Sequence, residues 1–302
     1  MQTIQQMTER RALITGINGF TGRYLASELQ AAGYRVFGTS REPDSSTPDR
    51  YTVDLCDRAE LAAVVAAVRP AVVAHLAAIS FVAHGDAETI YRVNIVGTRH
   101  LLEALAALDT PPDSVLLASS ANVYGNAPVE VIDELVPQAP ANDYAVSKLA
   151  MEYLARLWMD RLPIVITRPF NYTGVGQAPQ FLLPKIVSHF RAGAPEIALG
   201  NIDVARDFSD VRTVAVVYRR LLEAAPAGEV FNVCSGTAHT LTDVLRIMAG
   251  VAGYEINVTV NPAFVRANEV KRLLGSKDKL TGCIGPLPDI PIEATLGWMY
   301  GA

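Results

Sequence analysis

Short, mostly apolar runs alternate with longer amphipathic stretches through the first two-thirds of the chain, and this alternation constrains the fold more than any other feature. Because the runs are continuous, unlike the polar–apolar alternation of half-exposed strands, each should form a strand buried on both faces. The strands are expected at residues 12–15, 35–38, 51–53, 71–75, 114–118 and 164–168, and the connecting helices at 21–32, 58–69, 86–108 and 143–161. This order predicts an α/β fold with a doubly wound, parallel sheet.

The regular alternation ends after Pro169, where Gly, Pro and aromatic residues become frequent. A second, smaller domain is therefore expected, mainly C-terminal and also of α/β type. A helix at 210–225 and a strand at 230–233 should return to the large sheet. The first domain would then comprise residues 1–168 and 205–235, and the second residues 169–204 and 236–302, with a helix near 184–192 and a strand at 256–260.

Composition excludes several classes of protein. Half of the 302 residues are apolar and 19% are charged, which is ordinary for a globular chain and argues against disorder. The net charge of −5 gives no basic excess for binding nucleic acid. No apolar run approaches the roughly 18 residues of a membrane span, and the first residues lack a secretory signal, so a cytoplasmic protein with no membrane partner is expected. Cys56, Cys234 and Cys283 lie far apart, so we expect no metal site and no disulfide.

A glycine-rich segment, TGINGFTG at 15–22, follows the first expected strand and opens the first expected helix. In that context Gly16 permits a tight turn, Gly19 lets the backbone approach a pyrophosphate, and Gly22 lets helix and strand pack closely. The first N–H groups of the helix would then face the phosphates. The segment predicts a dinucleotide site, although an ordinary glycine-rich turn has the same appearance.

The end of the second expected strand indicates which dinucleotide binds. An NAD site usually has Asp or Glu there to bind the ribose 2′-hydroxyl. This chain instead has Gly38-Thr39-Ser40-Arg41, in which Ser40 and Arg41 could hold a 2′-phosphate. NADP(H) is therefore the favoured cofactor and NAD(H) the second choice, while Arg41 as a plain surface charge is the alternative.

Tyr144 and Lys148, in the segment YAVSK, are four residues apart and would share one face of a helix. An ammonium near a phenol lowers the pKa of the phenol, which then exchanges protons more readily at neutral pH. Ser120, in SSANVYG at 119–125, follows a buried strand and could hydrogen-bond a substrate carbonyl at the same edge of the sheet. A surface Tyr–Lys pair and a Ser that caps a turn are the plain alternatives.

These motifs, with Asp54-Leu55, HLAA at 75–78 and NIVGT at 94–98, occur in the expected order, and over about residues 11–275 the chain resembles the extended short-chain dehydrogenase/reductases that act on nucleotide sugars. The resemblance implies a Rossmann fold in which His75 is a buried strand residue and Asn94 ties helix to strand. It implies that Ser120, Tyr144 and Lys148 are catalytic. The cofactor contacts it implies are Gly16, Asn18, Gly19, Phe20, Gly22, Ser40, Arg41, Asp54, Leu55, Leu76, Ala77, Ala78, Tyr144 and Lys148.

The less regular segments resemble the GDP-mannose branch of this family. They are RPFNYTGVGQ at 168–177, FLLPKIV at 181–187, LGNIDVARDFSDVRTV at 199–214 and RANEVKRLLG at 266–275, the last with Ala267 where the family often has Pro. The resemblance implies a diphosphate held by Lys185, Arg206 and Arg266, with Glu269 on the guanosine ribose. The full implied set for a GDP-sugar is Ser80, Asn122, Asn171, Lys185, Arg206, Arg266 and Glu269. Surface salt bridges are the alternative for the charged residues.

Ala121 and Asn122 decide between reactions within that branch. The related 4,6-dehydratases have an acid at this place, because eliminating water needs an acid/base beside the sugar, and Asn cannot exchange protons at neutral pH. The resemblance therefore implies NAD(P)H-dependent reduction of the 4-keto group of GDP-4-keto-6-deoxy-D-mannose to GDP-D-rhamnose. The alternatives are a nucleotide-sugar 4-epimerase, a GDP-mannose 4,6-dehydratase and a non-catalytic NADP-binding sensor.

The same resemblance implies a quaternary structure. Relatives usually form a homodimer through a four-helix bundle, to which each subunit contributes two helices. The expected helices 86–108 and 143–161 are long and rich in Ala and Leu, which is compatible with that arrangement.

Overall fold

The computed structural model describes residues 9–44, 47–80, 86–262 and 271–302. The chain divides into two compact units, each built from separate stretches. Unit 1 contains residues 1–117, 151–165 and 218–229, and unit 2 contains residues 118–150, 166–217 and 230–302. The predicted boundary between a cofactor domain and a substrate domain is a functional division, and it stays a prediction.

Within the described residues, seven strands form the main sheet, in the order β10-β6-β5-β4-β1-β2-β3. Their bounds are β1 (Arg11–Thr15), β2 (Arg35–Ser40), β3 (Arg50–Thr52), β4 (Val72–His75), β5 (Ser114–Ala118), β6 (Ile164–Pro169) and β10 (Val230–Val233). β1 pairs in parallel with both β2 and β4. Because β1 lies between them, the chain winds outward from the middle in both directions, which confirms the doubly wound α/β fold.

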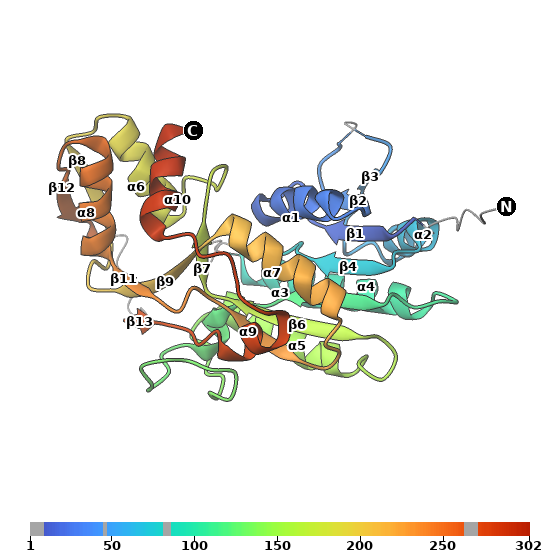
Figure 1. Cartoon of the computed structure of the whole chain (residues 1–302). Helices are drawn as coiled ribbons and strands as arrows, with labels where there is room; N and C mark the ends of the chain where they lie inside the picture. The colour runs from blue at the N-terminus through green and yellow to red at the C-terminus, as the bar shows by residue number, and fades with distance from the viewer. Residues whose placement is uncertain (1–8, 45–46, 81–85, 263–270) are drawn as a thin grey trace. The chain divides into compact units, whose positions relative to one another are not determined.

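The helices of unit 1 cover strands that are buried as predicted, except for β3 at the edge of the sheet, which has no buried residue. The helices are α1 (Phe20–Ala31), α2 (Arg58–Val68), α3 (Ala87–Tyr91) and α4 (Thr98–Ala106). α1 packs on β1 and β2, as Figure 1 shows in blue, and α2 packs on α4. Leu13 and Ile14 of β1 are fully buried, as a continuous apolar run predicts. A π-helical segment, Arg92–Gly97, lies between α3 and α4, inside the single helix predicted at 86–108.

Unit 2 has an apolar core of its own, in which three helices pack on one another within the described residues (Figure 1). They are α6 (Leu182–Arg191), α8 (Leu241–Ala252) and α10 (Ile292–Gly301). Strand β8 (Glu196–Leu199) pairs with β12 (Asn257–Val260) and contributes to the same core. A further sheet is centred on β9 (Ala205–Asp210), which pairs with β7 (Asn171–Thr173), β11 (Ala238–Thr240) and β13 (Arg272–Leu273).

The predicted helix 143–161 is shorter in the structure, and several strands of unit 2 are additional to those predicted. α5 (Asp143–Arg156) is followed by turns where the helix was expected to continue. Two further helices are α7 (Val211–Ala224) and α9 (Asp278–Ile284). β7, β8, β9, β11 and β13 were not expected, because they are short and partly polar and show no apolar run. None of the helices in the described ranges is long and apolar enough to span a bilayer.

Candidate active site

The glycine-rich turn between β1 and α1 leaves no room for larger side chains. Gly16 has a φ of +73°, and a Cβ atom added to it would lie 2.8 Å from the Cα atom of Ala77. A Cβ atom on Gly22 would lie 2.6 Å from the carbonyl oxygen of Ile17. Conformation and close approach therefore require glycine at the first position, and the packing of α1 on the turn requires it at the second.

The N-terminus of α1 is suited to an anion. Gly19 is the N-cap residue, and among the described residues no side chain caps it. The first turn of this fully described helix also contains no acidic residue. A helix start without a side-chain cap leaves N–H groups and the positive end of the dipole to a ligand. The turn thus fits the pyrophosphate of a dinucleotide.

The ends of β1, β2 and β4 lie side by side at this turn. Thr15 is the register partner of both Thr39 and His75, and the backbone N–H groups of Gly16 and Ile17 donate to the Thr39 carbonyl at 2.9 and 3.2 Å. Of the remaining predicted residues, Leu55 is buried, Asn18, Phe20, Ser40, Leu76, Ala77 and Ala78 are half-buried, and Arg41, Asp54 and Ser80 are exposed. Their contacts with a ligand stay predictions.

Ser120, Tyr144 and Lys148 lie together in unit 2. β5 ends at Ala118, and Ser120 precedes a 3-10 turn (Ala121–Tyr124), where its Oγ accepts the N–H of Asn122 at 3.2 Å. The Ser120 hydroxyl also hydrogen-bonds the phenol of Tyr144. One turn further along α5, the ammonium of Lys148 donates to the carbonyl of Ala118 at 2.7 Å. The structure therefore brings the three predicted catalytic side chains to one place.

Tyr144 is a protonated phenol in this environment. Burial raises its pKa well above the usual value of 10, the hydrogen bond with Ser120 lowers it by less, and the nearby phenol of Tyr172 raises it again. A protonated phenol beside a hydroxyl is what proton donation to a carbonyl oxygen requires. The lowering of this pKa by Lys148 stays a prediction. The sequence reasoning missed Tyr172, whose only signal was its place beside Asn171 in RPFNYTGVGQ.

A buried polar network holds the far end of the 3-10 turn. Arg168 is 2% exposed, and its guanidinium lies over the ring of Tyr124 and donates to the Tyr124 hydroxyl at 2.9 Å. The Tyr124 hydroxyl donates to Oδ1 of Asn232 at 2.8 Å, and the backbone N–H of Asn232 donates to Glu134 at 2.7 Å. Arg168 and Asn232 are register partners on β6 and β10. The network fixes Tyr124 and hence the turn that begins beside Ser120.

Of the predicted substrate residues that the structure describes, Ser80 lies in unit 1, and unit 2 contains Asn122, Asn171, Lys185 and Arg206. The amide Nδ2 of Asn171 is buried without a hydrogen-bond partner in the described part of the chain. Lys185 donates to the carbonyl of Ala198 at 2.6 Å, and Arg206 donates to the carbonyl of its neighbour Ala205 at 3.0 Å. Arg266 and Glu269 lie outside the described residues. Over those described, no group of three or more His, Cys, Asp or Glu side chains is arranged to hold a metal ion.

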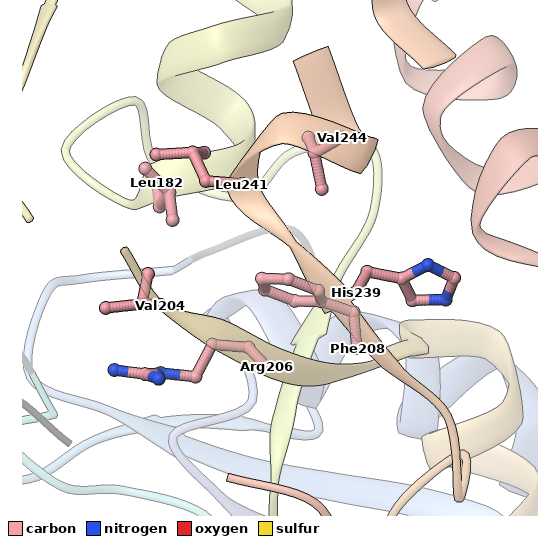
Figure 2. A pocket seen from close by; sticks show the side chains of 7 residues that line it. All are labelled: Leu182, Val204, Arg206, Phe208, His239, Leu241 and Val244. Atoms are coloured by element: carbon pink, nitrogen blue, oxygen red, sulfur yellow. The ribbon is translucent and has the colours of Figure 1, made fainter. Parts of the chain in front are cut away.

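Arg206 also lines a small hollow between β9, β11 and the start of α8. The other lining residues are Leu182, Val204, Phe208, His239, Leu241 and Val244 (Figure 2). In Figure 2 the side chains of Arg206 and His239 extend in opposite directions. The hollow does not admit a molecule of the size of water, so it provides no ligand pocket in this structure.

The sheet and its glycine turn define a dinucleotide-binding protein, and the clustered Ser, Tyr and Lys are those expected of a short-chain dehydrogenase/reductase. The chain belongs to the NAD dependent epimerase/dehydratase family, whose model matches residues 12–234. This finding confirms the family resemblance of the sequence motifs.

Two relatives and two solved structures are similar to this chain over more than nine-tenths of its length. The GDP-6-deoxy-D-talose 4-dehydrogenase of Aggregatibacter actinomycetemcomitans is 30% identical over 276 residues, 91% of each chain. The GDP-6-deoxy-D-mannose reductase of Pseudomonas aeruginosa is 34% identical over 299 residues, 95% of each chain. The structure of a candidate epimerase from Burkholderia cenocepacia J2315 is 56% identical, with a TM-score of 0.91 over 97% of both chains. RMD from Pseudomonas aeruginosa, solved with NADPH, is 32% identical, with a TM-score of 0.84 over 97% of this chain and 98% of that one.

Proposed function

We propose that this protein is an NAD(P)H-dependent reductase of 4-keto GDP-sugars that converts GDP-4-keto-6-deoxy-D-mannose to GDP-D-rhamnose. The observation that carries the proposal is the buried Ser120–Tyr144 pair, in which a protonated phenol stands beside a hydroxyl. The substrate class is supported by two relatives of matching length, named for a reductase and a dehydrogenase of GDP-6-deoxyhexoses.

The reaction adds a hydride to the keto carbon and a proton to its oxygen. A bound reduced nicotinamide supplies the hydride. Tyr144 gives its phenolic proton to the carbonyl oxygen as negative charge develops there, and Ser120 donates a hydrogen bond to the same oxygen. Lys148, a residue that is 4% exposed, provides a buried ammonium that stabilises the phenolate left on Tyr144. The net reaction converts one ketone to one secondary alcohol.

The turn after Ser120 favours reduction over dehydration. Elimination of water across carbons 5 and 6 of the sugar needs a group that takes one proton and returns another. The turn offers Ala121 and Asn122 at this place, and neither titrates near neutral pH. Asn122 instead donates its backbone N–H to Ser120. This arrangement supports a reductase and argues against a GDP-mannose 4,6-dehydratase.

A nucleoside diphosphate is supported by the polar groups of unit 2. The unpartnered buried amide of Asn171 needs an acceptor, which a phosphate oxygen provides. Lys185 and Arg206 add cations, and we keep Ser80, Arg266 and Glu269 as further predicted contacts. NADP(H) is favoured over NAD(H) because the exposed Arg41 follows β2 where an acid would otherwise bind the ribose, and because a related structure contains NADPH.

The test is a stoichiometric assay with GDP-4-keto-6-deoxy-D-mannose made enzymatically. We expect one NADPH to be oxidised per sugar, and NMR of the product to show the configuration of rhamnose at carbon 4. A product with the configuration of 6-deoxytalose would keep the reductase and correct the stereochemistry. Direct conversion of GDP-mannose to the 4-keto sugar by the pure protein would refute the proposal.

A 4-epimerase is the second candidate, because the structure that is 56% identical was described as a candidate epimerase. An epimerase recycles its cofactor within one catalytic cycle, whereas a reductase consumes it. Interconversion of two GDP-hexoses without net change in NADPH absorbance would therefore identify an epimerase. Binding of NADPH with no turnover of any nucleotide sugar would instead identify a non-catalytic sensor.

We also propose a cytoplasmic homodimer formed through a four-helix bundle, to which each subunit contributes the helical stretch within residues 86–108 and α5. α5 exposes Val146 and Tyr153, and Leu157 is exposed in the turn directly after its last residue; the three residues are 39%, 53% and 74% exposed. A polar substitution, Leu157→Glu, should shift the mass measured by light scattering from dimer toward monomer. A wild-type mass equal to that of one chain would refute the dimer.

A further inference from the structure

A continuous chain of buried hydrogen bonds runs through unit 1 from the glycine-rich turn to the π-helical segment. The N–H of Ala77 donates to the hydroxyl of Thr15 at 3.3 Å, and that hydroxyl lies 2.7 Å from Nδ1 of His75. Nε2 of His75 lies 2.9 Å from the hydroxyl of Thr98, which donates to the carbonyl of Asn94 at 2.7 Å. Thr15, His75, Thr98 and Asn94 are all buried, none of them more than 2% exposed.

The donors and acceptors of this chain fix the protonation of the imidazole. The Thr98 hydroxyl has one proton and uses it on the Asn94 carbonyl, so toward His75 it can only accept. Nε2 of His75 must therefore carry a proton. In the neutral ring Nδ1 is then the acceptor, and Thr15 donates to it while accepting the N–H of Ala77.

A second proton on the ring would break this pattern. With Nδ1 also protonated, the Thr15 hydroxyl would receive two donors, and its own proton would lose the acceptor that Nδ1 provides. A buried hydroxyl without an acceptor and a buried charge both cost free energy. The contacts therefore favour the neutral imidazole of His75 with its proton on Nε2.

Asn94 extends the chain to the segment that follows β4. Its Oδ1 accepts the N–H of Ile79 at 2.9 Å, and its Nδ2 donates to the Ile79 carbonyl at 3.2 Å. The segment that contains Ala77 is thus held at one end by Thr15 and at the other by Asn94. Since the space beside Gly16 is closed by the backbone of Ala77, any shift of this segment changes the glycine turn.

We infer that His75 is a positioning residue for the dinucleotide. Held as the neutral Nε2–H tautomer by Thr15 and Thr98, it sets the separation of the glycine turn from residues 76–78, and thereby the affinity for the cofactor. This inference rests on the proposed function for the identity of the ligand. Apolar packing alone would bury β4 equally well, but directional bonds hold its end at one position.

The tautomer is tested directly on protein labelled with 15N in histidine. The ring resonances of His75, assigned by their loss in His75→Gln, should be those of a neutral Nε2–H imidazole at neutral pH. A ring protonated on Nδ1, whether neutral or charged, would overturn the inference.

The positioning effect is tested by a matched pair at Thr15. Thr15→Val keeps the shape and removes the hydroxyl, and it should raise the Kd for NADPH about tenfold, or ~1.4 kcal/mol, in a fluorescence titration. Thr15→Ser keeps the hydroxyl and should restore the wild-type Kd. Ser114→Ala removes a buried hydroxyl of β5 that has no partner in the described structure, and Val65→Ala opens a cavity under the buried face of α2. Neither control should change the Kd.

The outcomes separate the inference from the proposed function. If Thr15→Val lowers Tm as Val65→Ala does and leaves the Kd for NADPH unchanged, the chain only stabilises the fold and the positioning effect is refuted. If the wild-type protein binds neither NADPH nor NADH, the proposed function fails and the dinucleotide effect with it. The histidine spectrum decides the tautomer in either case.

Discussion

Replacing either of two buried tyrosines of unit 2 by Phe should have contrasting effects: one variant should lose mainly stability and the other mainly catalytic rate. Tyr124→Phe removes the hydroxyl that accepts from Arg168 and donates to Asn232. A hydrogen bond to a charged group contributes about 1.5–3 kcal/mol and a neutral one about 1 kcal/mol, so the free energy of unfolding should fall by roughly 3 kcal/mol. Because Arg168 is 2% exposed, water cannot readily replace the lost partner.

Tyr144→Phe removes a hydroxyl whose hydrogen bond is to Ser120, a neutral group. The free energy of unfolding should change by about 1 kcal/mol or less. The rate should fall much further, because loss of a general acid costs roughly 10²–10⁴-fold. Tyr124→Phe, assayed well below its unfolding temperature, should retain kcat within about tenfold, since the donor on Tyr144 is still present.

Urea denaturation followed by tryptophan fluorescence gives the stabilities, and NADPH oxidation gives the rates. The reasoning is refuted if Tyr144→Phe is the more destabilised of the two variants. It is also refuted if Tyr124→Phe unfolds at the wild-type urea concentration, since the network would then contribute nothing. Near-normal turnover by Tyr144→Phe would mean that another group donates the proton.

Three further predictions concern the turn, the cofactor and acid stability. Gly22→Ala should lower the free energy of unfolding by about 1–3 kcal/mol through overpacking. Gly250→Ala should raise it by about 1 kcal/mol, because the described structure has nothing within 4 Å of the new Cβ. Equal denaturation midpoints of the two variants would contradict this. Arg41→Ala should weaken NADPH binding about tenfold and spare NADH, and equal losses would exclude a 2′-phosphate contact. Burial raises the pKa of Asp210, but hydrogen bonds led by Arg212 outweigh burial and lower the pKa below 3.8. The stabilisation of the folded state by the ionised Asp210 carboxylate is therefore complete above about pH 4 and lost as the pH falls through the lowered pKa. Asp210→Asn should make Tm less dependent on pH in the acid range, and an unchanged slope of Tm against pH would refute this.

The large sheet could be predicted because its signal is local. β1, β2, β4, β5 and β6 are short runs of mostly buried residues, and the burial of His75 followed from its place at the end of such a run. β3 is the exception, because Arg50 and Tyr51 are half-buried and Thr52 is exposed. The glycine turn could be predicted for the same reason, because Gly16, Gly19 and Gly22 lie within eight consecutive residues.

The polar interior could not be predicted, because its partners are distant in sequence. Arg168 and Tyr124 are 44 positions apart, and Tyr124 and Asn232 are 108 apart. β9 reads as a polar loop, yet its Asp207 is fully buried because Ser235 and Gly236 donate to its carboxylate. Such residues look like surface residues until the fold supplies the donors.

The division of the chain into interleaved stretches has a consequence at the level of the gene. Each unit is assembled from three separate stretches of sequence, so no single cut releases either unit intact. A recombination event that exchanged one unit for that of a relative would need several simultaneous crossovers. New specificity in this protein is therefore more accessible through substitutions of individual residues than through the shuffling of modules.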